Sequence, residues 1–143
     1  MARNHNTNDS HKYFDWLEFS SADLVAAQIL MDTGHCNDLA AFHCQQCMEK
    51  SLKAFSLYEN GRPLDGHNLT WLCKQAAKSD KRFNHWLDDS AKFNRYYIQT
   101  RYPSDQPLDI TDHTVEQIYR VAREMYDFIC LKVYGPGSVD DDD

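Results

Sequence analysis

The stretch FHCQQCMEKSLKAF, residues 42–55, decides how the rest of the chain is interpreted, because it combines helical spacing with a histidine, two cysteines and two lysines. Apolar side chains recur here every three or four residues, as one face of an α-helix requires. The members of this apolar stripe are Ala41, Cys44, Met48, Leu52 and Phe55. The spacing predicts a helix that begins near Asn37 or Asp38 and ends at Gly61.

The same periodicity appears on both sides of this helix. One helix is expected before it, from about residue 12 to residue 32, where apolar residues such as Leu17, Leu24 and Val25 recur at helical spacing before Gly34 ends the helix. Three are expected after it: a shorter helix around residues 69–76, another from about residue 80 to Pro103, and a last one from Thr111 or Asp112 to Gly135. No stretch alternates as a strand would. The sequence therefore predicts an all-α fold, an antiparallel up-and-down bundle of four long helices plus one short helix.

The length of 143 residues fits one domain with a real core. We expect a flexible N-terminus over residues 1–11, the helical bundle over residues 12–135, and an acidic, disordered tail over residues 136–143. The sequence contains no apolar run long enough to cross a bilayer and no basic-then-apolar leader. These features predict a cytoplasmic protein with no membrane partner.

The net charge of −7 is unevenly distributed. Residues 50–101 carry ten Lys and Arg against five Asp and Glu, whereas the two flanks together carry five against seventeen. Residues 140–143 alone supply four of the acidic side chains. An anionic ligand is therefore expected to bind the central segment.

The cysteines of residues 42–55 have three interpretations: a metal site, a redox pair or packing. Structural zinc usually takes four nitrogen or sulfur ligands, and no second Cys-x-x-Cys pair accompanies the nearby His35 and Cys36. A redox pair belongs at a helix N-terminus, whereas Cys44 and Cys47 fall in mid-helix. The favoured interpretation is that both thiols are reduced packing groups, with no metal and no cofactor.

The opposite face of the same helix is mixed basic, amide and apolar. Gln46, Lys50, Lys53 and Leu57 are expected to lie on it, near Leu39 and Phe42. One interpretation is that the lysines extend over apolar neighbours in the bundle. The other is that this face binds a partner or ligand, with its apolar side chains covered in a homodimer.

Three segments together resemble the HEPN domain, a family of small all-helical prokaryotic modules. They are QQCMEKSLKAF (residues 45–55), HNLTWL (67–72) and RYYIQTRYP (95–103), within a resemblance that covers residues 12–133. The resemblance implies a four-to-five-helix bundle, usually a homodimer, in a family proposed to bind nucleotides. It also implies a nucleotidyltransferase-type partner, and some family members are RNases that act as toxins in toxin–antitoxin or defence systems.

The RNase branch of the family depends on an Arg-x4–6-His motif late in the bundle. Arg62 and His67 have this spacing but fall in the loop before the third helix, and Arg95 is followed by no His until His113. Arginine cannot replace the missing histidine as a base, because it stays protonated. We therefore expect no catalytic residues and keep a metal-independent RNase toxin as the alternative function.

The remaining polar residues suit a site for a nucleotide or for RNA phosphate. Lysine and arginine bind phosphate, and tyrosine stacks on a base. Arg101 is expected to contribute most, because its planar guanidinium forms two bonds to one phosphate. An alternative for several of these residues is a role at a helix end, which for His67 is the start of the third helix. The candidate ligand-binding residues are Lys50, Lys53, His67, Arg95, Tyr97, Arg101 and Tyr102.

Overall fold

The structure, a computed structural model, describes residues 8–99, 103, 105 and 109–136, with side chains in the fourth α-helix up to Tyr96. These residues form five α-helices, one 3-10 helix (η1) and no strand. The elements are α1 (Tyr13–Thr33), α2 (Asn37–Asn60), α3 (Leu69–Ser79), η1 (Lys81–Trp86), α4 (Leu87–Gln99) and α5 (Asp112–Tyr134). The all-α prediction is confirmed, while the predictions for residues 1–7 and 137–143 lie outside the described residues.

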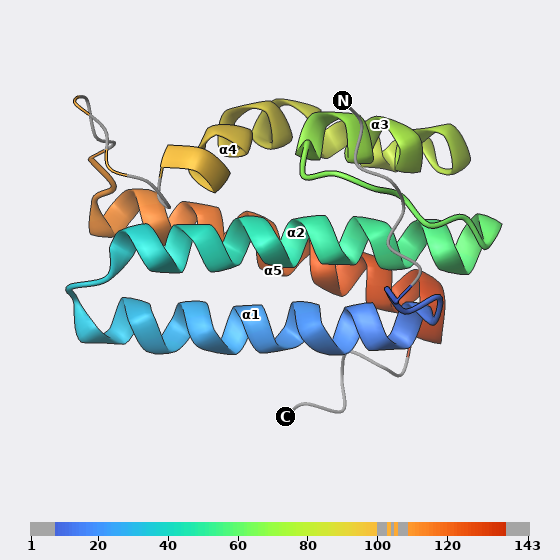
Figure 1. The fold of residues 1–143 in the computed structure, drawn as a ribbon, viewed down its shortest axis with the longest axis horizontal. Coiled ribbons are helices and arrows are strands. Elements are labelled where there is room, and N and C mark those ends of the chain that lie inside the picture. Colours follow the sequence, from blue (N-terminus) through green and yellow to red (C-terminus); the bar gives the residue numbers. More distant parts are fainter. Residues whose placement is uncertain (1–7, 100–102, 104, 106–108, 137–143) are drawn as a thin grey trace.

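Helix α2 lies at the centre of the bundle (Figure 1). It packs against α1, α3, α4 and α5, with α1 on one side, α3 and α4 on the opposite side, and α5 crossing behind it in the view of Figure 1. The apolar stripe predicted for it is confirmed, since every member is at most 1% exposed. No helix of the described part of the chain is long and apolar enough to span a membrane.

The second face of α2 differs from the expectation. Lys53 is 4% exposed and Leu57 is 7% exposed, so neither lies on an open surface. Helix α3 and the loop before it pack against this side of α2, which the spacing of residues in α2 alone could not reveal. The apolar patch of Leu39, Phe42 and Leu57, which was expected to form a homodimer interface, is therefore not continuous, because Leu57 is buried.

Helix ends follow the predicted signals in most places. Gly34 and Gly61 adopt left-handed conformations, with φ of 75° and 65°, that end α1 and α2. Thr111 caps α5 by accepting a hydrogen bond from the backbone N–H of Thr114. Asn37 does not cap α2; its side chain instead donates to the carbonyl of Ile110.

Helix α1 buries a face that is partly polar. Leu17 and Leu24 are buried as expected, and Ser20, Asp23 and Ala27 complete the buried face. Several apolar side chains point to solvent instead. The exposed members are Phe14, Phe19, Val25 and Ile29, which are 48%, 65%, 57% and 59% exposed.

Candidate functional site

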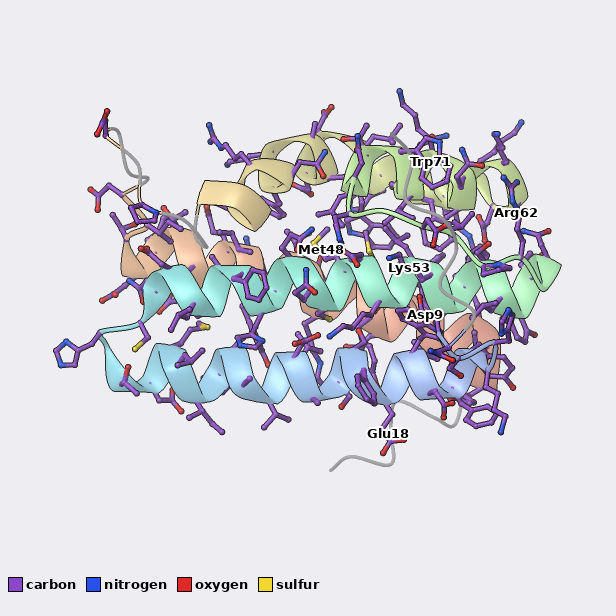
Figure 2. The ribbon with its side chains drawn as sticks, viewed as in Figure 1. Asp9, Glu18, Met48, Lys53, Arg62 and Trp71 are labelled. Carbon is purple, nitrogen blue, oxygen red and sulfur yellow. The ribbon has the colours of Figure 1, made fainter. Side chains whose placement is uncertain are left out.

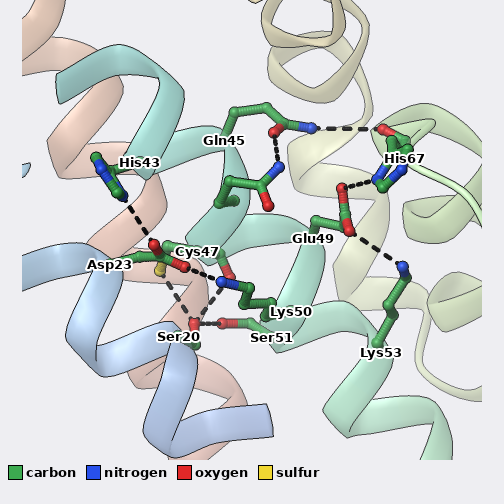
Figure 3. Close-up of polar contacts among 11 residues, drawn as sticks. Ser20, Asp23, His43, Gln45, Cys47, Glu49, Lys50, Ser51, Lys53 and His67 are labelled. Atoms are coloured by element: carbon green, nitrogen blue, oxygen red, sulfur yellow. Dashed lines mark hydrogen bonds and ion pairs between the residues drawn. The ribbon is translucent and has the colours of Figure 1, made fainter. Parts of the chain in front are cut away.

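Two buried carboxylates organise the polar residues of the bundle (Figure 3). Asp23 of α1 binds one histidine and one lysine, and Glu49 of α2 binds another histidine and another lysine. We call the first group, Asp23 with His43 and Lys50, the Asp23 cluster. The second group, Glu49 with Lys53 and His67, is the Glu49 cluster.

The Asp23 cluster joins α1 to α2. His43 Nδ1 lies 2.9 Å from Asp23 Oδ1, and Lys50 Nζ lies 2.7 Å from Asp23 Oδ2. His43 and Lys50 are seven residues apart, so both project from one side of α2 toward the same carboxylate. The Asp23 side chain is 9% exposed, whereas His43 and Lys50 are 31% and 22% exposed. The carboxylate therefore holds two partly exposed donors at the surface between the helices.

The Glu49 cluster joins α2 to the loop before α3. Lys53, one turn after Glu49, places Nζ 3.0 Å from Glu49 Oε2, and both side chains are at most 5% exposed. His67 Nδ1 lies 2.8 Å from Glu49 Oε1, and its side chain is 40% exposed. Gln45 also donates a 3.4 Å hydrogen bond to the carbonyl of His67. The loop that carries His67 is thus fixed to α2 at two points.

Aromatic rings of α1 lie beside both lysines. Lys50 Nζ is 5.8 Å from the centre of the Phe19 ring, and Lys53 Nζ is 5.6 Å from that of Trp16. These distances permit cation–π attraction. A cavity of about 210 Å³ is lined by Trp16, Phe19 and Lys50 together with Asp15 and residues 8–10.

The cysteines of residues 42–55 are buried and form no disulfide. Burial raises the pKa of the Cys44 thiol well above its usual range and raises that of Cys47 to about 12. Ser20 donates a 2.8 Å hydrogen bond to the carbonyl of Cys47. No group of three or more His, Cys, Asp or Glu side chains in the described ranges is placed to hold a metal ion. The thiols act as packing groups with little thiolate character.

Three of the seven predicted ligand residues belong to the two clusters, and two of these, Lys53 and His67, meet at the same carboxylate. Lys50 belongs to the Asp23 cluster, and Lys53 and His67 belong to the Glu49 cluster. Arg95 is exposed on α4, with its guanidinium 5.7 Å from the centre of the Tyr96 ring. Arg101 and Tyr102, together with the side chain of Tyr97, lie outside the described residues.

The start of the third helix is capped by a neighbour of His67. Asn68 has this role, because its side chain accepts a hydrogen bond from the backbone N–H of Trp71. His67 bonds to Glu49 instead.

Three residues of the two clusters were not predicted as site residues: Asp23, His43 and Glu49. One signal was available for Asp23, because it is an acid on the otherwise largely uncharged buried face of α1. A buried acid requires a partner, and here the cations come from a different helix. Chemically, each carboxylate orients one imidazole ring and neutralises one ammonium group.

The chain is a small all-α module, a helical bundle whose central helix carries two carboxylate-held lysines. The sequence matches the HEPN domain over residues 13–133, and the chain belongs to the HEPN domain family. No curated protein matches the sequence.

Two solved structures share the fold. TT1696 from Thermus thermophilus superposes with a TM-score of 0.74 at 25% identity, covering 84% of this chain and 97% of that one. ST0689, an archaeal HEPN homologue, gives a TM-score of 0.67 at 20% identity, covering 85% and 98% of the two chains. At 20% identity, the similarity to ST0689 shows a shared fold and nothing further.

Proposed function

We propose that this HEPN domain binds the phosphate of a nucleotide or of RNA at the surface between α1 and α2. The observation that carries the proposal is Lys50, a partly exposed ammonium group held by Asp23 beside the exposed ring of Phe19. A fixed cation next to an aromatic face suits a ligand that has both a phosphate and a base.

The net charge of the Asp23 cluster limits how strongly it attracts an anion. Asp23 shares one negative charge between His43 and Lys50, so a phosphate must compete with a carboxylate for these donors. Asp23 nevertheless fixes the positions of both donors, and such preorganisation lowers the entropy lost on binding. Arg95, Arg101, Tyr97 and Tyr102 remain separate proposed ligand-binding residues, and Arg95 lies on α4, across α2 from this surface.

The biological setting proposed for the chain follows from its family. The domain acts as a homodimer in the cytoplasm, together with a nucleotidyltransferase-type protein in a toxin–antitoxin or defence system. The experiment is a binding screen of the purified protein against nucleotides and single-stranded RNA at two salt concentrations. Saturable binding that weakens with salt supports the proposal, and the lack of binding to either ligand class at millimolar concentration contradicts it.

A metal-independent RNase is the second candidate, favoured by the two carboxylate-held imidazoles. Glu49 orients His67, which follows Arg62 by five positions, and Asp23 orients His43. A carboxylate that fixes an imidazole ring is the arrangement used by many general bases. RNA incubated with the protein and EDTA should then be cleaved, and His67→Gln or His43→Gln should abolish cleavage. Intact RNA in this assay would exclude the RNase.

A further inference from the structure

The cavity of about 210 Å³ beside the Asp23 cluster adjoins the surface proposed to bind phosphate. Lys50 lines this cavity and also binds Asp23, so the cavity and the cluster share one ammonium group. Asp9, another lining residue, lies in front of α1 and α2 in Figure 2. Pockets that enclose a drug-sized ligand measure roughly 300–1,000 Å³, so this cavity holds one part of a nucleotide and not the whole.

Two aromatic rings of α1 form walls of the cavity. Phe19 is 65% exposed, so most of its ring is open to a ligand. Trp16 is half-buried, and its Nε1 donates a 2.8 Å hydrogen bond to the carbonyl of Ser10, which fixes the ring. Aromatic side chains stack on the flat face of any nucleic-acid base. The walls therefore suit a base, but they do not select one.

The charges of the lining decide which end of a nucleotide enters. Asp9 and Asp15 line the cavity together with Lys50, and two carboxylates against one ammonium group leave the lining negative. Such a cavity repels a phosphate and attracts a neutral group that carries N–H donors. The phosphate is therefore expected outside the cavity, at Lys50 and His43, and the base inside it.

Asp15 supplies an acceptor whose position is fixed. Its Oδ2 accepts a 2.6 Å hydrogen bond from Ser10 Oγ, and Ser10 Oγ accepts a 3.0 Å bond from the backbone N–H of Lys12. The two oxygens of a carboxylate offer about four acceptor positions, so most of them remain after the bond from Ser10. A base in the cavity thus meets a carboxylate that is already oriented.

We infer that the cavity holds a guanine base. Guanine presents two adjacent donors, N1–H and the N2 amino group, which match the two oxygens of one carboxylate. Adenine, cytosine and uracil each present one donor group next to an acceptor, and a carboxylate repels that acceptor. The inference rests on the proposed function, because it identifies the base that accompanies the phosphate bound by Lys50.

Calorimetric titration of the purified protein with GMP and IMP tests the inference, because IMP differs from GMP only in lacking the N2 amino group. The wild type should bind GMP at least about tenfold more tightly than IMP, since one hydrogen bond to a charged acceptor is lost. AMP, which presents an acceptor at N1, should bind more weakly than IMP. Equal affinities for GMP and IMP would overturn the inference.

Two variants separate recognition of the base edge from stacking. Asp15→Asn should reduce the preference for GMP over IMP to less than about threefold, because the charged acceptor is lost. Phe19→Ala should weaken the binding of both nucleotides at least about fivefold and leave the preference unchanged. The matched control is Asp88→Asn on the exposed surface of α4, which should bind like the wild type.

Circular dichroism verifies that each variant is folded. A folded Asp15→Asn variant that keeps the full preference for GMP would overturn the role of this carboxylate.

Nucleosides distinguish the failure of this inference from that of the proposed function. A preference for guanosine over inosine, with no gain in affinity from the phosphate of GMP, would support the guanine cavity and contradict phosphate binding. Equal binding of guanosine and inosine, with GMP bound more tightly than guanosine, would overturn the guanine cavity and leave phosphate binding at Lys50 standing. The lack of binding of any of these ligands at millimolar concentration would overturn both.

Discussion

Glu49 and Lys53 form an ion pair in which both side chains are at most 5% exposed. Such a pair contributes little net stability over well-packed apolar side chains, because both charges lose their hydration. Removing one member is costly, because the remaining charge stays buried. His67 supplies only a partial replacement for Lys53, since it lies at the surface with 40% exposure.

Lys53→Met should therefore lower the free energy of unfolding by about 3 kcal/mol. Combining it with Glu49→Gln should recover most of that loss, because no uncompensated charge is left. Urea unfolding followed by far-UV circular dichroism measures both changes, with Lys74→Met on exposed α3 as the control. If Lys53→Met were as stable as the control, the buried pair would be refuted.

Cys44 is a second residue whose role depends on burial. It is 0% exposed, and its raised pKa keeps the thiol protonated. Cys44→Ser should lower the free energy of unfolding by about 1–3 kcal/mol, because a hydroxyl is placed on an apolar face. Cys36→Ser, at a half-buried position, should change it by less than about 0.5 kcal/mol.

Metal analysis completes this test. Stoichiometric zinc in protein purified without added metal would contradict the packing role. So would a stability of Cys44→Ser equal to that of the wild type.

The sequence predicted Lys50, Lys53 and His67 as ligand-binding residues but did not predict the carboxylates that bind them. Glu49 and Asp23 contribute to the site through contacts across the bundle, one to the loop at His67 and one to the facing helix. Spacing within one helix cannot show such contacts. The prediction that Lys53 lies on an open basic face was wrong for the same reason, because spacing within α2 could not show that other elements cover Lys53.

At the scale of elements, Asp80 joins three parts of the chain. Its side chain accepts a hydrogen bond from the backbone N–H of Arg82 at the start of η1. It also forms ion pairs with the Arg82 guanidinium and with Lys132 of α5. These bonds hold the pKa of the Asp80 carboxyl well below its usual range.

The pH dependence of stability follows from that shift. Because the pKa is lowered by folding, the stabilisation is present above the unfolded pKa and is lost as the pH falls toward the folded pKa. Asp80→Asn keeps a capping oxygen but removes the ion pairs, so it should cost about 1 kcal/mol at pH 6. The difference from the wild type should shrink between about pH 4 and pH 2.

Urea unfolding at a series of pH values measures this difference, and Asp80→Ala shows the additional loss of the cap. A difference between the wild type and Asp80→Asn that stays constant from pH 6 to pH 2 would show that the ion pairs do not stabilise the fold.

The existence and order of the helices could be predicted from periodicity and from Gly34, Gly61 and Thr111. Two details of the helices could not be predicted in this way. The fourth predicted helix begins as the 3-10 helix Lys81–Trp86, where Phe83 packs into the core. Helix α1 has apolar residues on two faces, so periodicity predicted burial of Val25, which is 57% exposed.

At the scale of the whole molecule, charge divides the bundle into two surfaces. Helix α1 carries four acids and no bases, whereas residues 50–101 carry twice as many bases as acids. An anionic ligand is therefore attracted to the basic segment, of which Lys50 lies beside α1.

The central claim is that Lys50 binds the phosphate of a nucleotide or RNA. The most direct measurement is fluorescence anisotropy of a labelled single-stranded RNA, titrated at several salt concentrations with the wild type, Lys50→Gln and the control Lys74→Gln. Lys50→Gln should weaken binding about tenfold, because one charge-assisted hydrogen bond is lost, and should reduce the salt slope by about 0.7. Lys74→Gln should bind like the wild type. If Lys50→Gln binds as tightly as the control with an unchanged salt slope, the claim is contradicted.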